Sequence, residues 1–248
     1  MPGDPTVIVT GGRGSIGRET IARLAARGCP VVALDREPLA PQTAALVARE
    51  LTVDLLDDDA VAAALASAAD LPPPRHVIGI AGGGDAEELS QADPATEPLE
   101  VFARVVENNL HIAFTTIRHA VPLLRQATGH RSITLVGSIN AYGGYGAPGY
   151  SAAKAGLSGL VNALATPLGA EGIGISCVAL GTVDTDNLRH LDEVRGRVYN
   201  PDAIAARAPL RRILTPGEVA DALVAFALDT PGLTGTTITL DNGQTRIR

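Results

Sequence analysis

Lysine is nearly missing from this sequence: of its twenty basic side chains, one is a lysine, Lys154, and all the others are arginine. Arginine and lysine serve about equally well as exposed point charges. A single lysine therefore indicates a place where a compact ammonium on a flexible stem is needed instead of a planar fork of donors. The alternative is that Lys154 is a chance survivor on a solvated face. Composition alone leaves both interpretations open.

Aromatic and sulfur-containing side chains are also scarce. With three Phe, four Tyr and no Trp, the core has to be built from aliphatic residues, and 46% of the chain is hydrophobic, which is enough for a sizeable core. The two cysteines, Cys29 and Cys177, lie beside apolar segments that are far apart in the sequence. We therefore expect buried thiols, as in a reducing cytoplasm.

Several functional classes are excluded by what is absent. The net charge is −7 and no stripe of arginines with interleaved aromatics occurs, which argues against a nucleic-acid partner. No basic start is followed by an apolar stretch, and no apolar run reaches the roughly 18 residues of a membrane span, so we expect neither a signal peptide nor a membrane helix. The five histidines show no metal-ligand spacing, so no metal site is expected. A cytoplasmic location is the resulting expectation.

Short β-branched runs alternate with longer helical patterns, which is typical of a parallel sheet covered by helices. The predicted strands are 6–10, 31–35, 51–54, 76–81, 132–136, 174–180 and 236–240, and the predicted helices are 16–27, 57–69, 98–126, 150–169 and 216–228. We predict an α/β fold: a single Rossmann-type domain over 1–248, with a doubly wound parallel sheet of about seven strands and helices on both faces. Pro167 is expected to kink its helix or to end it early. The polar, arginine-rich segment 184–212 is the expected substrate lid.

A glycine-rich turn, Thr10-Gly11-Gly12-Arg13-Gly14-Ser15-Ile16-Gly17, joins the first predicted strand to the first helix. Glycines there let the backbone approach a pyrophosphate, which the helix N-terminus stabilises, although a tight structural turn gives the same pattern. The second strand ends in Asp35, 18 residues after Gly17. An acidic group at that place accepts hydrogen bonds from the adenosine ribose and repels a 2′-phosphate. This favours NAD, while Arg13 and Arg36 keep NADP open.

Lys154 follows Tyr150 by four residues, in Tyr150-Ser151-Ala152-Ala153-Lys154. On a helix this spacing places the phenol and the ammonium on the same face, one turn apart. A cation beside a tyrosine favours the phenolate, so we expect the pKa of Tyr150 to be lowered from about 10. Tyr150 would then be a usable proton donor and acceptor near neutral pH.

These features resemble the short-chain dehydrogenase/reductase family, over essentially the whole chain. The shared features are the glycine-rich turn, Asp35, Ser138, the Tyr150/Lys154 pair and the terminal Leu240-Asp241-Asn242-Gly243, all in the family's order. The resemblance implies an NAD-dependent oxidoreductase that interconverts a secondary alcohol and a ketone by hydride transfer. Two alternatives stay open: an NADPH-dependent ketoreductase, and a dinucleotide-binding sensor or scaffold without turnover.

The resemblance also implies a catalytic tetrad of Asn109, Ser138, Tyr150 and Lys154. Tyr150 would exchange a proton with the substrate oxygen, and Ser138 would hydrogen-bond that oxygen and stabilise the charge that develops on it. Lys154 would lower the pKa of Tyr150 and hold the nicotinamide ribose, and Asn109 would anchor a water that relays protons to Lys154. Purely structural roles remain the alternative for Asn109 and Ser138.

The same resemblance implies a set of cofactor-binding residues. They are Gly11, Arg13, Ser15, Ile16, Gly17, Asp35, Arg36, Asp54, Leu55, Ala81, Gly82, Tyr150, Lys154, Val183 and Thr185. Three departures from the family pattern lie nearby: Ser15 replaces the middle glycine, Gly79-Ile80 replaces two asparagines, and Leu180 replaces a proline. These departures concern the geometry of the cofactor site and leave the proton-transfer groups intact.

Substrate and assembly are less specified. The loop 139–149 is expected to line the substrate pocket through Asn140, Tyr142 and Tyr145. The lid arginines either hold an anionic substrate or form a solvated face. The helix that begins near Tyr150 carries a stripe of mostly small residues, which either lets another helix approach closely or packs on the sheet. The resemblance implies a homotetramer or homodimer built on this helix and the long one before it. The members of the stripe are Ala153, Gly156, Gly159, Leu160 and Ala163.

Overall fold

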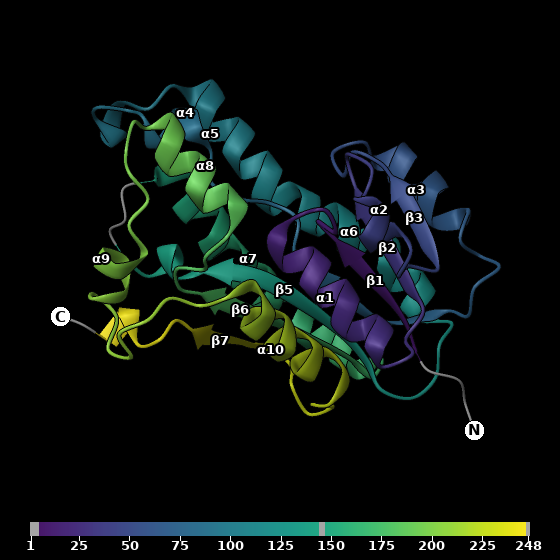
Figure 1. The fold of residues 1–248 in the computed structure, drawn as a ribbon. Coiled ribbons are helices and arrows are strands. Elements are labelled where there is room, and N and C mark those ends of the chain that lie inside the picture. The colour runs from purple at the N-terminus through teal and green to yellow at the C-terminus, as the bar shows by residue number, and fades with distance from the viewer. Residues whose placement is uncertain (1–4, 144–146, 247–248) are drawn as a thin grey trace.

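A parallel sheet of seven strands forms the centre of the computed structural model, which describes residues 5–143 and 147–246 (Figure 1). The strand order is β3-β2-β1-β4-β5-β6-β7, and each neighbouring pair is parallel. The strand order reverses at β1, with β2 and β3 on one side of it and β4 to β7 on the other, which is the doubly wound topology of a Rossmann-type domain. The strands are β1 (Thr6–Thr10), β2 (Val31–Asp35), β3 (Arg49–Thr52), β4 (Pro74–Gly79), β5 (Arg131–Ser138), β6 (Ile173–Leu180) and β7 (Thr236–Leu240).

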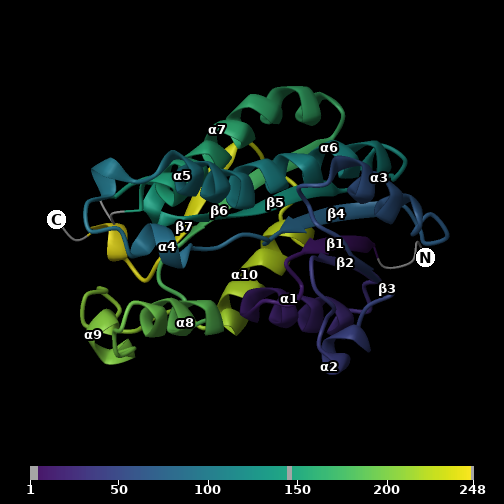
Figure 2. The same cartoon turned by 90° about the horizontal axis from the view of Figure 1, so that it is seen from above.

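Helices cover both faces of this sheet (Figure 2). One face carries α1 (Ser15–Ala26) and α10 (Pro216–Leu228), which pack against each other, and the other carries α3 (Asp58–Ala66), α6 (Ile112–Leu124) and α7 (Pro148–Ala170). The shorter helices are α2 (Pro41–Ala44), α4 (Ala86–Leu89), α5 (Leu99–Val106), α8 (Asp186–Val194) and α9 (Pro201–Ala205). The predicted fold class is therefore confirmed.

The central strands are apolar on both sides because each face is buried under helices. β1 is buried along its whole length: Val7 and Val9 belong to the core under α1 and α10, and Ile8 belongs to the core under α6 and α7. Both cysteines are buried thiols, as expected. β7, at the edge, is only partly buried. Within the described residues, no helix is long and apolar enough to cross a membrane.

Some predicted boundaries were wrong. The helix predicted over 98–126 is two α-helices, α5 and α6, joined by a π-helical turn at Glu107–His111. β3 begins and ends two residues earlier than predicted, so Asp54 lies beyond it. Pro167 does not end its helix, since α7 continues to Ala170. The missing N–H of Pro167 falls in the last turn, where burial of Leu168 against the core stabilises the remaining residues.

Candidate active site

The glycine-rich turn after β1 leaves the start of α1 open. Gly14 precedes the helix, and no side chain caps the first N–H groups of α1. Gly11 has φ of 73°, and a Cβ there would lie 2.8 Å from the backbone nitrogen of Ala81, while a Cβ on Gly17 would collide with the carbonyl oxygen of Gly11. A bare helix N-terminus behind a glycine cradle suits the pyrophosphate of a dinucleotide. The predicted residues Gly11, Ser15, Ile16 and Gly17 are thus brought together here.

Two carboxylates lie beside this turn at the end of β2. Asp35 Oδ2 accepts a hydrogen bond from the backbone N–H of Arg13 at 3.0 Å, and the guanidinium of Arg13 pairs with Glu37 at 3.1 Å. Arg36 is exposed and makes no ion pair or hydrogen bond through its side chain within the described segments. The predicted NADP-binding arginine, Arg13, is therefore held by a carboxylate, and Glu37 adds a second negative charge that was not singled out in the sequence.

Asp54 and Leu55, two of the predicted cofactor-binding residues, have local structural roles. Asp54 Oδ1 accepts from the N–H of Leu56 at 2.9 Å, which closes a turn after β3, and Leu55 is buried in the core. At the end of β1, the hydroxyl of Thr10 accepts from the N–H groups of Ile80 and Ala81 at 3.2 and 3.3 Å. Thr10 thus supports the segment in which Gly79-Ile80 replaces the family's asparagines, a role that sequence reasoning missed.

Asn109 lies in the π-helical turn, not in an α-helix as expected, and is 1% exposed. Its Oδ1 accepts from Gly83 N–H at 2.9 Å, and its Nδ2 donates to the carbonyl oxygens of Gly83 and Val105, each at 3.0 Å. The amide therefore ties the loop after Gly82 to α5. Gly82 itself has φ of 121°, and a Cβ there would lie 2.6 Å from Asn109 Oδ1. The predicted water relay through Asn109 stays a prediction.

Ser138, Tyr150 and Lys154 meet at the carboxyl ends of β5 and β6. Ser138 ends β5, and its hydroxyl donates to Asn140 Oδ1 at 3.1 Å; its proximity to the phenol of Tyr150 lowers the pKa of that phenol. Tyr150 is in the first turn of α7. Lys154, one turn later, is 3% exposed; its Nζ donates to the carbonyl oxygen of Val136 at 3.1 Å and lies 5.5 Å from the centre of the Tyr150 ring. The solvated-face interpretation of Lys154 is wrong.

Burial dominates the proton affinities of this pair. It raises the pKa of Tyr150 above its ordinary value, outweighing the opposing effect of Ser138, and the carboxylate of Glu88 raises it further. Burial also lowers the pKa of Lys154 to about 8, against a smaller opposing effect of Cys177. The expected lowering of the Tyr150 pKa is therefore not what the protein alone produces, because desolvation disfavours the charged form of each group.

The segment after β6 packs over the glycine-rich turn. Val183 bridges to Leu214, and the Thr185 hydroxyl caps α8 by accepting from Leu188 N–H at 3.2 Å. Asp186, the first residue of α8, accepts from the Ser15 hydroxyl at 2.9 Å and from Arg18 at 2.8 Å. Ser15, the departure from the family glycine, thus connects the pyrophosphate turn to the segment that was predicted to be a lid.

The arginines of the segment 184–212, the predicted lid, divide into two groups. Arg189 pairs with Asp184 at 2.7 Å, and the Tyr199 hydroxyl donates to the same carboxylate at 2.8 Å. Arg195 and Arg197 have no carboxylate within ion-pair distance in the described residues. They line a polar pocket together with residues of the C-terminal end of α4, Leu89, Ser90 and Gln91.

Of the predicted substrate-pocket residues, Asn140 contacts Ser138 and Tyr142 is about half exposed. Tyr145 lies outside the described residues. Sequence reasoning missed Glu88, a buried residue of α4 whose Oε1 accepts from the backbone N–H of Tyr150 at 2.9 Å. No sequence signal separates it from its exposed neighbour Glu87, because the contact joins segments 62 residues apart.

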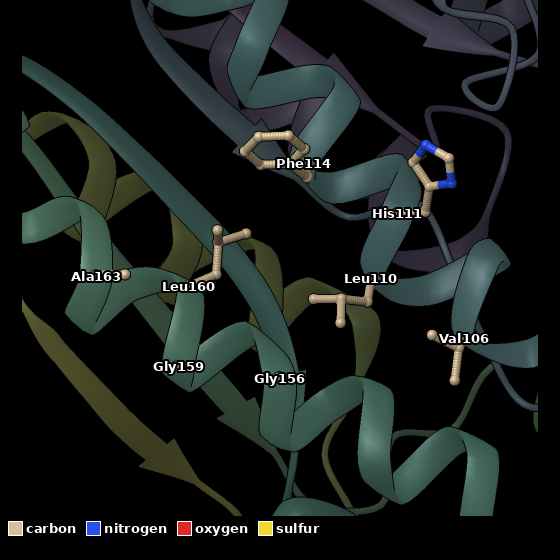
Figure 3. Close-up of a pocket in the computed structure, with 8 residues that line it drawn as sticks. All are labelled: Val106, Leu110, His111, Phe114, Gly156, Gly159, Leu160 and Ala163. Carbon is tan, nitrogen blue, oxygen red and sulfur yellow. The ribbon is translucent and has the colours of Figure 1, made fainter.

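A second concave surface, away from the glycine-rich turn, lies between α7 and the α5–α6 segment (Figure 3). Leu160 and Phe114 point toward each other across it, and Leu110 reaches toward Gly156, where a Cβ would lie 2.7 Å from the Leu110 side chain. Phe114 is 47% exposed. We call this surface the α6/α7 groove; its lining residues are Val106, Leu110, His111, Phe114, Gly156, Gly159, Leu160 and Ala163.

The doubly wound sheet, with its glycine cradle at a bare helix N-terminus, places the chain among Rossmann-type α/β proteins. A family model described as enoyl-(acyl carrier protein) reductase matches residues 11–245. The chain belongs to the short-chain dehydrogenase/reductase family. Members of this family are oxidoreductases that act on CH–OH groups of small-molecule substrates with NAD(H) or NADP(H).

Individual relatives cover nearly the whole chain. Cis-4-hydroxycyclohexanecarboxylate dehydrogenase of Sinomonas cyclohexanicum is 32% identical over 97% of this chain and 96% of its own. The 3-oxoacyl-(acyl-carrier-protein) reductase MabA of Mycobacterium tuberculosis is 32% identical over 96% of this chain and 92% of its own. A solved oxidoreductase of the family from Burkholderia thailandensis superposes with a TM-score of 0.84 at 27% identity, covering 99% of this chain and 94% of its own.

Proposed function

We propose that this protein is an NAD-dependent oxidoreductase that interconverts a secondary alcohol and a ketone. The observation that carries the proposal is the buried lysine, Lys154, beside Tyr150 and Ser138 at the edge of the sheet where the glycine cradle opens. Tyr150 exchanges a proton with the substrate oxygen, Ser138 hydrogen-bonds that oxygen, and Lys154 supplies the positive charge that favours the phenolate. Asn109 completes the tetrad by holding the loop at Gly83 and anchoring a water. The bound dinucleotide supplies or accepts the hydride.

The residues proposed to hold the cofactor follow the carboxyl ends of β1, β2, β3, β4 and β6 or lie at the start of α7. Gly11, Ser15, Ile16 and Gly17 hold the pyrophosphate. The residues that bind the adenosine part are Arg13, Asp35, Arg36, Asp54 and Leu55. The residues that bind the nicotinamide part are Ala81, Gly82, Tyr150, Lys154, Val183 and Thr185.

NAD is favoured over NADP by the charges at the end of β2. Asp35 and Glu37 are both carboxylates, and Glu37 already occupies the guanidinium of Arg13 at 3.1 Å. A 2′-phosphate would have to displace Glu37 and approach Asp35, which opposes it electrostatically. The unpartnered side chain of Arg36 is the observation that favours the second candidate, an NADPH-dependent ketoreductase.

The substrate proposal is a secondary alcohol or its ketone, bound between the loop with Asn140 and Tyr142 and a lid formed by 184–212. The relatives suggest the compounds to test first, since one is a dehydrogenase of cis-4-hydroxycyclohexanecarboxylate and another a reductase of 3-oxoacyl groups. A panel should therefore contain cyclic hydroxy acids, simple cyclic alcohols and 3-oxo esters.

The test is absorbance at 340 nm with NAD or NADH and this panel. Tyr150→Phe removes the proton-exchanging hydroxyl, so we expect turnover to fall by about 10²–10⁴-fold while NADH binding is retained. Undiminished turnover in Tyr150→Phe refutes the mechanism. Tighter binding of NADPH than of NADH refutes the cofactor assignment. Cofactor binding without turnover across the panel would instead support a sensor or scaffold.

For assembly, we propose that the α6/α7 groove binds a second copy of this chain in a homodimer or homotetramer. The groove is apolar, Phe114 is half exposed within it, and the small residues of α7 let another helix approach closely. Light scattering should give a dimer or tetramer for the wild type, and Phe114→Glu should give the monomer. A monomeric wild type contradicts this proposal. The cytoplasmic location remains a prediction.

A further inference from the structure

The helix that carries Tyr150 begins without a cap of its own. The residue before α7 is Ala147, whose methyl group cannot accept a hydrogen bond, and Pro148 at the first position has no N–H. Ser151 N–H is satisfied, since it donates to the carbonyl oxygen of Ala147 at 2.8 Å. The N–H groups of Gly149 and Tyr150 are therefore the two donors at this helix start that need a partner from elsewhere.

Glu88 of α4 provides that partner. Its Oε1 accepts from the N–H of Tyr150 at 2.9 Å, and the N–H of Gly149 also stabilises its negative charge. A Cβ on Gly149 would lie 3.0 Å from the same oxygen, so the absence of a side chain there allows the close approach. Glu88 is 2% exposed, which makes this an internal contact between two segments 62 residues apart.

The short helix α4 is itself held in place by its N-terminal cap and by ion pairs to α5. Asp85 caps it, accepting from the N–H groups of Glu87 and Glu88 at 2.9 and 3.1 Å. Arg104 of α5 pairs with Asp85 at 3.3 Å and with Glu87 at 2.8 Å. Because Arg104 connects Asp85 and Glu87 to α5, the carboxylate of Glu88 has a defined position relative to α7.

The surroundings of Glu88 also affect its charge. Burial raises its pKa, and the carboxylates of Glu97 and Asp85 raise it further, while the N–H groups of Tyr150 and Gly149 lower it. Arg104, a cation of α5, is paired with Asp85 and Glu87. Glu88 Oε2 and both carboxylate oxygens of Glu97 are buried without a hydrogen-bond partner among the described residues.

We infer that Glu88 is a positioning residue of the Tyr150/Lys154 site. Its carboxylate caps α7 at the residue that bears the phenol, and its negative charge opposes ionisation of that phenol. The catalytic part of this inference rests on the proposed function, since it presumes that Tyr150 exchanges a proton with the substrate. The cap and the charge effect are properties of the protein alone.

Three variants separate the two effects. Glu88→Gln keeps an acceptor for the Tyr150 N–H but removes the charge, and Glu88→Ala removes both. Glu100→Gln is the control, because Glu100 is an exposed carboxylate on α5 whose side chain makes no ion pair or hydrogen bond among the described residues. The readouts are hydrogen exchange of the Tyr150 amide by NMR and ultraviolet titration of the phenols, with Tyr150→Phe identifying the Tyr150 contribution.

In Glu88→Gln we expect protection of the Tyr150 amide to be retained and the phenol to ionise at lower pH, by about half a unit or more. The pH profile of kcat should move in the same direction with little change in cofactor KM. In Glu88→Ala we expect at least a tenfold faster exchange of the Tyr150 amide and about a tenfold lower kcat. Glu100→Gln should match the wild type in every measurement.

The inference is overturned if Glu88→Gln and Glu88→Ala leave both the amide exchange and the phenol titration as in the wild type. Should Glu88→Ala fail to fold, the titration of Glu88→Gln decides the question. A wild type that turns over no compound of the panel refutes the proposed function. Exchange and titration would still decide whether Glu88 positions Tyr150, because neither measurement needs a substrate.

Discussion

Replacing the buried lysine by methionine should make the protein more stable. Lys154 is 3% exposed, and the one hydrogen bond of its ammonium group goes to the carbonyl oxygen of Val136 at 3.1 Å. Burial lowers its pKa from 10.5 to about 8. This difference of about 2.5 pKa units corresponds to about 3 kcal/mol of destabilisation of the folded state near neutral pH. Met has a similar length and no charge, so Lys154→Met should recover most of that free energy.

The pH dependence gives this prediction its sign. Well below pH 8 the lysine is protonated in both states, and the folded state carries the full cost of the buried charge. Between pH 8 and 10.5 the folded protein binds fewer protons than the unfolded chain, so wild-type stability rises with pH. The advantage of Lys154→Met should therefore be about 3 kcal/mol at pH 7 and should shrink toward zero near pH 10.5.

The assay is thermal unfolding followed by far-ultraviolet circular dichroism, since the chain has no Trp. Protein concentration is held equal, because assembly contributes to apparent stability. At pH 7 the midpoint temperature should rise by about 6–12 °C. Arg207→Met, at an exposed arginine, is the control and should change little. A Lys154→Met protein that is less stable at pH 7, or whose advantage does not depend on pH, would refute the reasoning.

Three further changes test other parts of the structure. His76 is buried and its pKa is lowered to about 3, so below pH 6.5 the folded state binds fewer protons than the unfolded chain. The free energy of unfolding should therefore fall by about 2 kcal/mol between pH 7 and pH 5. In His76→Asn, urea titrations at these two pH values should no longer show this part of the decrease. Asp186→Asn removes a negative charge at the start of α1, so calorimetry should show NADH binding several-fold tighter, and weaker binding would contradict the placement of the pyrophosphate. Lys154→Arg keeps the charge but brings a bulkier guanidinium into a site where the ammonium donates to the carbonyl oxygen of Val136. We expect kcat/KM to fall at least 100-fold. Near-normal turnover would show that this position does not require a lysine.

The sheet and its covering helices could be predicted from the sequence because their signal is local. The run from Val7 to Val9 is apolar at every position, which is what a strand buried on both faces requires, and the same holds for residues 31–34 of β2. The π-helical turn at Glu107–His111 gave no such signal. It continues the periodicity of the helices on either side, and it is recognisable only once Asn109 is seen bonded to Gly83.

The residues of the candidate site were predictable to the extent that they follow strand ends in a fixed order. Their electrostatics were not. The spacing of Tyr150 and Lys154 correctly predicts that they are near each other, but the pKa of each group depends on how much water is excluded, which is a property of the whole packed domain. The same limit applies to Glu88, whose partner N–H is 62 residues away.

The burial that disfavours each charge separately also strengthens the attraction between them. Near the 5.5 Å that separates the ammonium of Lys154 from the Tyr150 ring centre, a phenolate and an ammonium attract by less than about 1 kcal/mol in water. At the effective dielectric constant of about 20 that suits protein sites, the attraction is about 3 kcal/mol in favour of the phenolate. That gain matches the cost of burying Lys154, and it is lost if the cation is moved out into solvent. An exposed arginine could not supply it, which explains why a chain that otherwise uses arginine keeps one lysine here.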